Sequence, residues 1–325
     1  MTILKRVLQK FNGFYYSREY ICLPLEQHTF PLQVLLVRES KVVKDITAMQ
    51  VMVGISPLII ALPSLEEVDQ ENWQHIYTVY SNSSIKEGAT VSNDKIVGSL
   101  QLEKIKNQKV GDFFIYYFEG IVGKHRFIPH INQIINRFYN SFYNRSKGNI
   151  FLKGNLYTQL QVAYSVPKII ALITVGCNDL YNLLPTDQHG QINNEYYIIT
   201  LRKAGNACKQ ALDAGKIVLS NVYAGYYKEV YAFGKNHMQP LKEIDSFDFS
   251  GDRTQILNYP LPKHVIAYRE LELAESFEHG IHRIFLFRIL AYKKNIADLP
   301  VLSCIHNAYA TWRFKQHLPC NHFLT

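Results

Sequence analysis

The amino-acid sequence predicts a mainly β protein with short helices, arranged as two tandem halves. The chain of 325 residues contains 22 tyrosines and 18 phenylalanines, and aromatic side chains are enriched in strands. Short apolar runs separated by turn-forming residues recur along the chain, which is typical of buried strands. The order of these runs in the first half recurs in the second half, and so long a period indicates tandem domains.

The first half opens with a predicted strand at Pro31–Val37, and a basic turn follows from Arg38 to Lys44. A second strand is predicted at Pro57–Leu62 from its apolar run. A helix is predicted from about Leu65 to Tyr80, and the polar stretch Ser81–Gly88 predicts a loop after it.

Apolar residues at helical spacing predict another helix near the end of the first half. These residues are Ile131, Ile134, Ile135, Phe138 and Phe142. We expect this face to pack against the core. The alternative is a nucleic-acid surface between Arg137 and Arg145. It is disfavoured because the basic residues behind the net charge of +8 are spread along the chain, not grouped in a stripe.

The second half contains the stretch with the most distinctive chemistry, Val166–Leu212. Its apolar run Lys168–Val175 predicts a buried strand, and Gly176–Asp179 predicts a tight turn. The polar segment Tyr181–Gly190 follows, and Tyr196–Leu201 predicts a second strand.

Arg202 and Lys203 stand between that second strand and a predicted short helix, Ala204–Ala214, which Gly215 closes. Hydroxyl, amide, imidazole and guanidinium groups therefore gather between strand ends and a helix start. Helix-start N–H groups and fixed cations are the groups that bind phosphate in proteins. The sequence thus predicts a phosphate site beside Arg202.

The repeat divides the chain into two predicted domains, 1–148 and 149–325, with an insertion in the second copy within Tyr223–Pro262. Chance likeness of β-rich segments is the alternative explanation. The corresponding motifs are Pro31-Leu-Gln-Val with Pro167-Lys-Ile-Ile, Leu58-Ile-Ile-Ala with Tyr196-Tyr-Ile-Ile, Leu100-Gln-Leu-Glu with Leu271-Glu-Leu-Ala, and Asp112-Phe-Phe-Ile-Tyr with His282-Arg-Ile-Phe-Leu.

After the helix come a strand-like run, Lys216–Val222, and a final strand that begins with Gly280-Ile281-His282. With these, the order of elements over Val166–Lys294 resembles the flavin reductase-like, FMN-binding split barrels. One departure from that pattern is the absence of the proline pair often found before the second strand, where Asn193-Asn194-Glu195 stands instead.

The resemblance implies an FMN-dependent oxidoreductase with a small-molecule redox substrate and NAD(P)H as a possible co-substrate. Split barrels of this family pair as two-fold dimers with FMN at the interface. Two fused split β-barrels therefore imply an intrachain pseudo-dimer, which is monomeric or assembles further into a homodimer. Two alternatives stay open: a non-catalytic flavin- or haem-binding protein, and a degenerate barrel that serves as an interaction module.

Eight residues are candidates for cofactor binding because they offer donors or charges to a phosphate, a ribityl chain or an isoalloxazine ring. They are Thr186, Asp187, Gln188, His189, Arg202, Lys203, Asn206 and His282. No catalytic residue is identified, and Asp187 near His189 is expected to form a local turn more readily than a general base. The basic segment Gly234–Met238 is expected to form a lid or a nicotinamide contact.

The two halves differ in charge at the predicted helix start. The second copy has Arg202 and Lys203 there, whereas the first copy has Glu66 and Glu67, which repel a phosphate. The sequence therefore predicts one flavin site per chain, built mainly from the second half and partly walled by the first.

Several classes of protein are disfavoured by the sequence. No apolar run is long enough for a membrane span. His317, Cys320 and His322 form only a loose cluster, so no metal is expected. The five cysteines include no CxxC pair, which favours reduced thiols in the cytoplasm.

Overall fold

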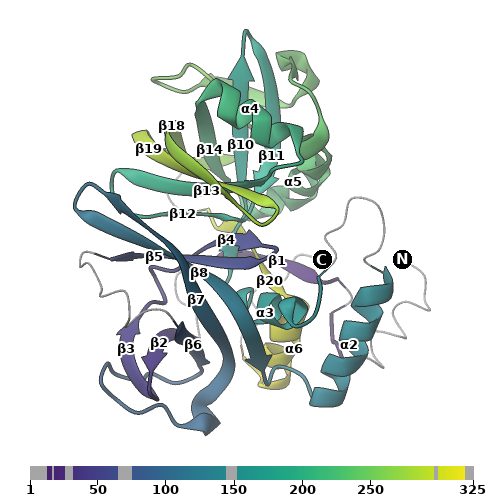
Figure 1. Cartoon of the computed structure of the whole chain (residues 1–325). Coiled ribbons are helices and arrows are strands. Elements are labelled where there is room, and N and C mark those ends of the chain that lie inside the picture. Colours follow the sequence, from purple (N-terminus) through teal and green to yellow (C-terminus); the bar gives the residue numbers. More distant parts are fainter. Residues whose placement is uncertain are drawn as a thin grey trace.

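The fold consists of two large antiparallel sheets joined by a small third sheet (Figure 1). The computed structural model describes residues 13–16, 18–25, 32–64, 75–143, 152–295 and 299–318. Within these residues, the first large sheet belongs to the first half of the chain and the second to the second half.

The first large sheet has seven strands in the order β3-β2-β6-β7-β8-β5-β4. Its strands are β2 (Gln33–Arg38), β3 (Lys41–Asp45), β4 (Val51–Ile55), β5 (Leu58–Ser64), β6 (His75–Ser81), β7 (Ile96–Val110) and β8 (Phe113–His125). A short 3-10 helix, η2 (Asn93–Lys95), precedes β7.

The second large sheet has eight strands in the order β12-β13-β19-β18-β14-β10-β11-β15. Its strands are β10 (Ala171–Cys177), β11 (Leu180–Thr186), β12 (His189–Gln191), β13 (Tyr196–Arg202), β14 (Lys216–Val222), β15 (Lys242–Glu243), β18 (Val265–His279) and β19 (His282–Lys294). A separate pair, β16 (Phe249–Arg253) and β17 (Pro260–Pro262), lies in the long connection between β14 and β18.

The two sheets have the same strand order when β2 is matched with β10 and the following strands are matched in turn, with β15 as an extra edge strand. The long hairpins match in detail, because each has a strand of 15 residues followed by one of 13. Their register shifts fall at equivalent positions, after Gln101 and Lys104 in the first hairpin and after Glu270 and Leu273 in the second.

Both sheets are open in the part of the chain that the structure describes, since no pairing joins the two edge strands of either one. The prediction of a mainly β chain with short helices is confirmed. The finer prediction of two closed split barrels differs from this arrangement, because closure requires the edge strands to pair.

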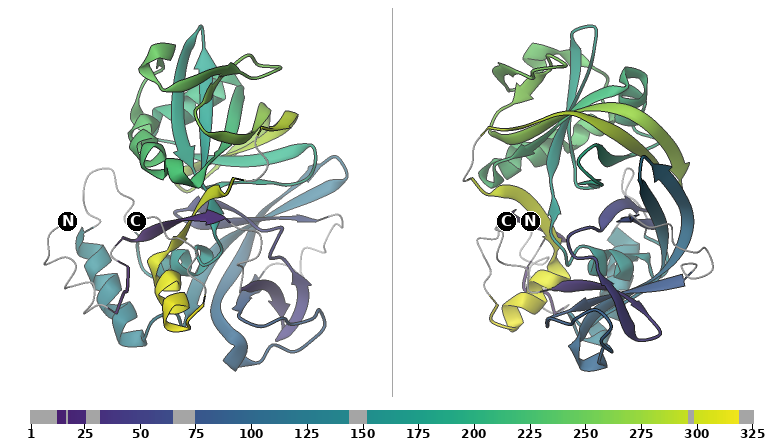
Figure 2. Two further views of the ribbon diagram at one scale, coloured as in Figure 1. Left: turned by 180° about the vertical axis from the view of Figure 1, so that it is seen from behind. Right: turned by 90° about the vertical axis from the view of Figure 1, so that its left-hand side faces the viewer.

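The third sheet joins the distant parts of the chain and has the order β1-β20-β9. Its strands are β1 (Tyr20–Leu25), β9 (Lys168–Ile169) and β20 (Val301–His306). Figure 2 shows β1 in purple and β20 in yellow side by side where the two large sheets meet.

The helices are short and lie around the sheets. They are α2 (His130–Tyr143), α3 (Leu156–Ala163), α4 (Asn206–Ala214), α5 (Tyr227–Ala232), α6 (Asn307–Lys315) and the 3-10 helices η3 (Ala224–Tyr226), η4 (Phe233–Met238) and η5 (Ile244–Ser246). The predicted end of α4 is confirmed, because Gly215 adopts φ 61° and its N–H bonds to the Ala211 carbonyl.

Two sequence predictions were wrong. The segment His75–Ser81 is a strand between β2 and β7 rather than the end of a helix. The residues Lys41–Asp45 form β3, so the turn of that hairpin shrinks to Glu39 and Ser40, both at positive φ. The polar segment Tyr181–Gly190, for which no element was predicted, is mostly strand, because pairing with β10 overrides its turn-forming composition.

The helix α2 was predicted correctly, but its apolar face does not pack on the core. Ile131 and Phe138 are 68% and 67% exposed, and Ile134 and Ile135 are also exposed. The helical spacing of the apolar residues therefore predicted the helix correctly but not the exposure of its apolar face. The predicted helix between Leu65 and Gln74, its carboxylates Glu66 and Glu67, and the domain boundary at 148 lie outside the described residues.

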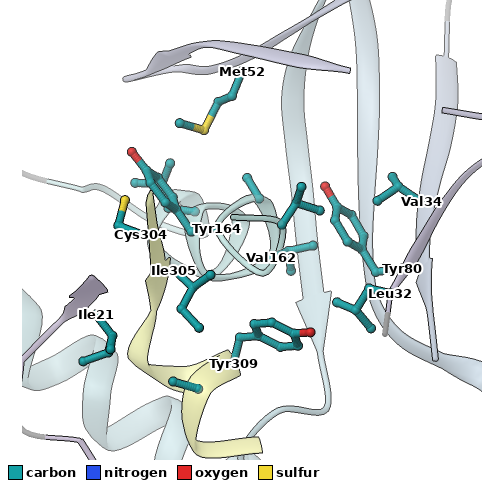
Figure 3. Close-up of a cluster of buried hydrophobic side chains, with 14 of the residues drawn as sticks. Ile21, Leu32, Val34, Met52, Tyr80, Val162, Tyr164, Cys304, Ile305 and Tyr309 are labelled. Atoms are coloured by element: carbon teal, nitrogen blue, oxygen red, sulfur yellow. The ribbon is translucent and has the colours of Figure 1, made fainter. Parts of the chain in front are cut away.

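The largest core cluster includes the third sheet, α3, α6 and one face of the first large sheet. Figure 3 shows part of it, with Tyr80 and Val34 of the first sheet on one side and Ile305 and Cys304 of β20 on the other. A smaller cluster contains residues of both halves, among them Ile115 and Tyr117 of β8 and Ile284 and Leu286 of β19. Buried apolar area thus holds the two halves together.

Candidate functional site

A cavity of about 740 Å³ opens where the second large sheet meets the third sheet and the end of β4. We call it the Arg202 cavity. Its lining comes from the β11–β12 turn, the β13–α4 connection, helices α3 to α5, and residues of β1, β4 and β20. A volume in this range fits a cofactor, since ligand sites measure about 300–1,000 Å³.

The β11–β12 turn places the first group of predicted residues on the cavity wall. Thr186 ends β11, and Asp187 and Gln188 connect it to β12. The Thr200 N–H donates to the Gln188 carbonyl over 3.0 Å, which ties this turn to β13. The predicted residues Thr186, Asp187 and Gln188 therefore come together in one wall.

Arg202 supplies the cation of the cavity. It ends β13 with an exposed side chain, and α4 begins four residues later with Gly205 as its N-cap. No acidic residue occupies the first turn of α4, and no side chain caps its N–H groups. Since a helix start carries partial positive charge, it adds to the field of the guanidinium on the same wall.

The predicted lid segment Gly234–Met238 forms another wall, and it is hydrogen-bonded in place. His237 donates from Nε2 to the Pro185 carbonyl over 2.9 Å, and Asn236 donates to the Leu183 carbonyl over 2.7 Å. Asn206 donates to the Met238 carbonyl over 2.8 Å. These bonds fix the segment across β11 and the start of α4, so it is a fixed wall of the cavity.

A buried polar cluster also borders the cavity, and its Asp187 acts electrostatically on Arg202. The Tyr164 hydroxyl donates to Asp187 Oδ2 over 2.7 Å. Burial raises the pKa of the Asp187 carboxyl, against the opposing effects of the Tyr164 hydroxyl and the Lys168 cation. Burial also lowers the pKa of Lys168 to about 8, although the Asp187 charge works in the other direction. The cavity wall therefore combines the Arg202 cation with a buried carboxyl and, behind it, an ammonium whose pKa values are both shifted toward neutrality.

Two buried polar atoms of the lining residues have no protein partner. Among the residues that the structure describes, Gln188 Oε1 and Thr200 Oγ1 are buried without a hydrogen bond. An unpaired buried polar atom costs about 1–3 kcal/mol. Such atoms beside a cavity are consistent with a ligand that completes their hydrogen bonds.

Two predicted residues, His189 and His282, lie behind the cavity wall. His189 donates from Nε2 to the Ile169 carbonyl over 3.0 Å, and its Nδ1 lies 2.8 Å from the Tyr197 hydroxyl. His282 is fully buried, and its Nε2 accepts the Ile55 N–H over 3.1 Å. Burial lowers the pKa of each imidazole to about 4, so both are neutral at pH 7. They position β9 and β4, whose residues stand next to the cavity.

The last two predicted residues also turn away from the cavity. Lys203 Nζ forms an ion pair of 3.3 Å with Glu278 Oε2 on the β18–β19 hairpin. Asn206 is committed to the Met238 carbonyl. Four of the eight predicted residues, Thr186, Asp187, Gln188 and Arg202, therefore line the cavity.

Several lining residues were not predicted from the sequence. Tyr20, Tyr164, Tyr231 and Cys304 line the same cavity, yet they lie far from Arg202 along the chain. The placement of Tyr20 and Cys304 depends on the pairing of β1 with β20, which no local pattern reports. A local signal did exist for Lys168, because a lysine opening an apolar run is unusual unless its ammonium has a polar partner.

In the described part of the chain, no three His, Cys, Asp or Glu side chains could hold a metal ion. Cys320 and His322 lie outside that part. None of the described helices is long and apolar enough to cross a membrane.

No protein-family profile matches the sequence, and no curated protein matches it. Solved structures do match about half of the chain. An NADH:FAD oxidoreductase of Streptomyces globisporus is 18% identical, with 47% of this chain and 89% of that chain covered at a TM-score of 0.40. An FMN-binding protein of Thermus thermophilus is 17% identical, with 50% of this chain and 89% of that chain covered at a TM-score of 0.38.

The flavin reductase of a styrene monooxygenase from Pseudomonas putida is 16% identical, with 46% of this chain and 92% of that chain covered at a TM-score of 0.37. The resemblance to flavin reductase-like, FMN-binding structures is thus present among solved structures, over about half of the chain. At these identities and TM-scores the likeness says nothing about the ligand of this chain.

Proposed function

We propose that this protein is a flavoprotein that binds FMN in the Arg202 cavity and transfers electrons between it and a small-molecule substrate. The observation that carries the proposal is the composition of the cavity wall. One end combines Arg202 with the uncapped start of α4, and the wall also holds the unpaired polar atoms of Gln188 and Thr200.

The residues present fit the parts of FMN. The phosphate dianion suits Arg202 and the α4 N–H groups, because charge-assisted hydrogen bonds are the strong ones. The isoalloxazine ring has donors and acceptors on one edge, which suit the Gln188 amide and the Thr200 hydroxyl. The ring is otherwise apolar and matches lining side chains such as Ile55, Leu160 and Leu201.

When bound, the flavin supplies the two-electron redox chemistry, as cofactors of this kind do. The chain binds and orients it. Asp187 and Tyr164 hold a proton between them in the cavity wall. NAD(P)H is the electron donor we favour, and the wall formed by His237 and Met238 is the surface on which its nicotinamide would rest.

We further infer that the two halves are copies of one ancestral domain and form a pseudo-dimer within the chain. Identical strand order and matching hairpin lengths and bulges support this inference. The active cavity is built mainly by the second copy, and the first contributes Ile55 of β4.

Titration of the apo-protein with FMN tests the proposal. We expect saturable binding, with a shift in the visible absorption and quenching of the flavin fluorescence. Anaerobic addition of NADH or NADPH should then bleach the bound flavin. A protein that leaves the spectrum of added FMN unchanged would rule out the flavoprotein assignment, and binding without bleaching by either nucleotide would remove the NAD(P)H step.

A further inference from the structure

Cys22 and Cys304 face each other across the third sheet. They are register partners in the antiparallel pair β1 and β20, and Lys168 of β9 is the register partner of Cys304 on its other side. Directly opposed residues point to the same face, so the three side chains form a row across three strands.

This geometry is compatible with a disulfide. Opposed residues of an antiparallel pair have Cα atoms about 4.5–5.5 Å apart. A disulfide spans Cα separations of about 4.4–6.8 Å. Both cysteines are thiols in this structure. The oxidised pair therefore needs little movement of the two backbones.

The row faces the Arg202 cavity. Cys304 and Tyr20 both line it and lie two register positions apart on the same face of the third sheet. Cys22 is 4% exposed and lies behind Cys304, which is 2% exposed. Figure 3 shows the Cys304 side chain beside Tyr164, whose hydroxyl bonds to Asp187. A ligand in the cavity thus meets Cys304, and Cys304 meets Cys22.

Groups for moving the thiol proton stand beside Cys304. Asp187 Oδ2 lies 3.9 Å from Cys304 Sγ and accepts the hydrogen bond of the thiol. The Lys168 side chain, opposite Cys304 in register, favours the thiolate once the proton has left. Burial and the Asp187 charge raise the pKa of the Cys304 thiol, and the Lys168 ammonium opposes them.

We propose that Cys22 and Cys304 are a redox-active dithiol that exchanges two electrons with the flavin in the Arg202 cavity. The inference rests on the proposed function. On oxidation the two S–H bonds break and one S–S bond forms. The two electrons and two protons pass to the oxidised flavin, which becomes the dihydroflavin. Cys304 is the thiol next to the flavin, and Cys22 is its partner in the disulfide.

A competing explanation is that the two thiols are only small packing residues in the β1–β20 pair, since buried cysteines often serve that role. That explanation predicts no disulfide between them under any condition that leaves the fold intact. It also predicts that a flavin bound in the cavity stays oxidised beside the reduced thiols.

The flavin arm of the test uses the full chain, reduced and freed of reductant, with an excess of FMN under strict exclusion of oxygen. After denaturation and alkylation, we expect two fewer alkylated cysteines than in the reduced chain. Peptide mapping should place the disulfide between Cys22 and Cys304, and one flavin should be bleached per disulfide. Flavin that binds but forms no disulfide overturns the proposal.

A second arm separates this failure from failure of flavin binding. The same reduced chain without flavin is treated with one equivalent of diamide, a small thiol oxidant, and we again expect the Cys22–Cys304 disulfide. If diamide forms it but bound flavin does not, the electron exchange is refuted. If diamide links other cysteines or none, the pairing itself is refuted, whether or not FMN binds.

Three variants complete the design. Cys22→Ala and Cys304→Ala should each abolish both the disulfide and the bleaching. Cys177→Ala, at an exposed position on β10, is the matched control and should leave both unchanged. Circular dichroism of each variant shows whether the fold is retained, and a variant that loses the fold is replaced by the corresponding serine.

Discussion

At the residue scale, the proposed function assigns phosphate binding to Arg202. Replacement Arg202→Ala should weaken FMN binding by about 1.5–3 kcal/mol, the contribution of a hydrogen bond to a charged group. Riboflavin, which has no phosphate, should bind the variant and the parent chain almost equally. Fluorescence titration with both ligands measures the two effects.

Lys203 provides the neighbouring control. It has the same charge as Arg202, but its ammonium pairs with Glu278 away from the cavity. The Lys203→Ala variant should therefore bind FMN nearly as the parent does. If Arg202→Ala weakened FMN and riboflavin by the same factor, Arg202 would not meet the phosphate.

Because two histidines are buried, we expect the protein to lose stability in mild acid. Burial lowers the pKa of His125 and of His282 to about 4, and each ring accepts a backbone N–H, from Phe127 and Ile55 respectively. The unfolded chain has an imidazole pKa of about 6.5 and binds more protons between these values. Stability is therefore full above pH 6.5 and falls as the pH drops toward 4.

Between pH 7 and pH 5, the free energy of unfolding should fall by about 2 kcal/mol for each histidine. Urea unfolding at a series of pH values measures it. The His125→Asn variant should lose only the contribution of His125, and the dependence due to His282 and to His189, whose pKa burial also lowers to about 4, should remain. A free energy of unfolding that stays constant from pH 7 to pH 5 would show that neither ring is held neutral.

At the element scale, the two long hairpins are alike in construction but differ in what their tips touch. Gly111 and Gly280 begin the two turns, both with positive φ, at 58° and 54°. A Cβ atom on Gly111 would meet nothing within 4 Å, whereas one on Gly280 would lie 2.2 Å from Pro57 Cδ. The second hairpin therefore docks on the β4–β5 turn, and the first remains open at this position.

This difference makes the two glycines a matched pair for mutagenesis. Gly111→Ala should cost only the left-handed backbone conformation, about 1–2 kcal/mol. Gly280→Ala should cost about 1–3 kcal/mol more, because the methyl group displaces the turn. It should also weaken FMN binding, since β4 provides Ile55 to the cavity. Thermal unfolding and titration of both variants test this, and equal destabilisation would refute the docking.

Local patterns predicted some of these elements and missed others for physical reasons. The end of α4 at Gly215 and the strand over Leu58–Ile60 depend on backbone conformation and apolar runs, which the sequence displays directly. Much of Tyr181–Gly190 has turn-forming composition, yet its pairing with β10 made it a strand. The pairing of the third sheet was missed, although its strand β9 falls within the predicted run Lys168–Val175, because the partner of β1 lies near the other end of the chain.

The sequence likewise predicted some residues of the candidate site and missed others. Thr186, Asp187, Gln188 and Arg202 are close in sequence to a strand end, where polar residues gather at an opening. His189 and His282 have the same chemistry but belong to strands whose pleat turns them inward, and one register position decides this. Tyr164 and Cys304 join the site only through tertiary packing.

At the scale of the whole molecule, the two halves differ at the position of the cation. When β5 is matched with β13, residue for residue, Ser64 takes the place of Arg202. The first half therefore lacks the charge that a phosphate needs at this point. We expect one FMN per chain by isothermal titration. Binding of two FMN molecules per chain with similar affinity would show that the first half has a site of its own.

The pairing of β1 with β20 also determines how the molecule responds to force. Tyr20, the first residue of β1, lies opposite His306, the last residue of β20. Tension applied through the residues before Tyr20 and after His306 therefore pulls at one end of the ladder, where the strands peel apart one pair of hydrogen bonds at a time. Such unzipping needs less force than sliding a whole strand, so the third sheet, and the Arg202 cavity with it, would open before either large sheet yields.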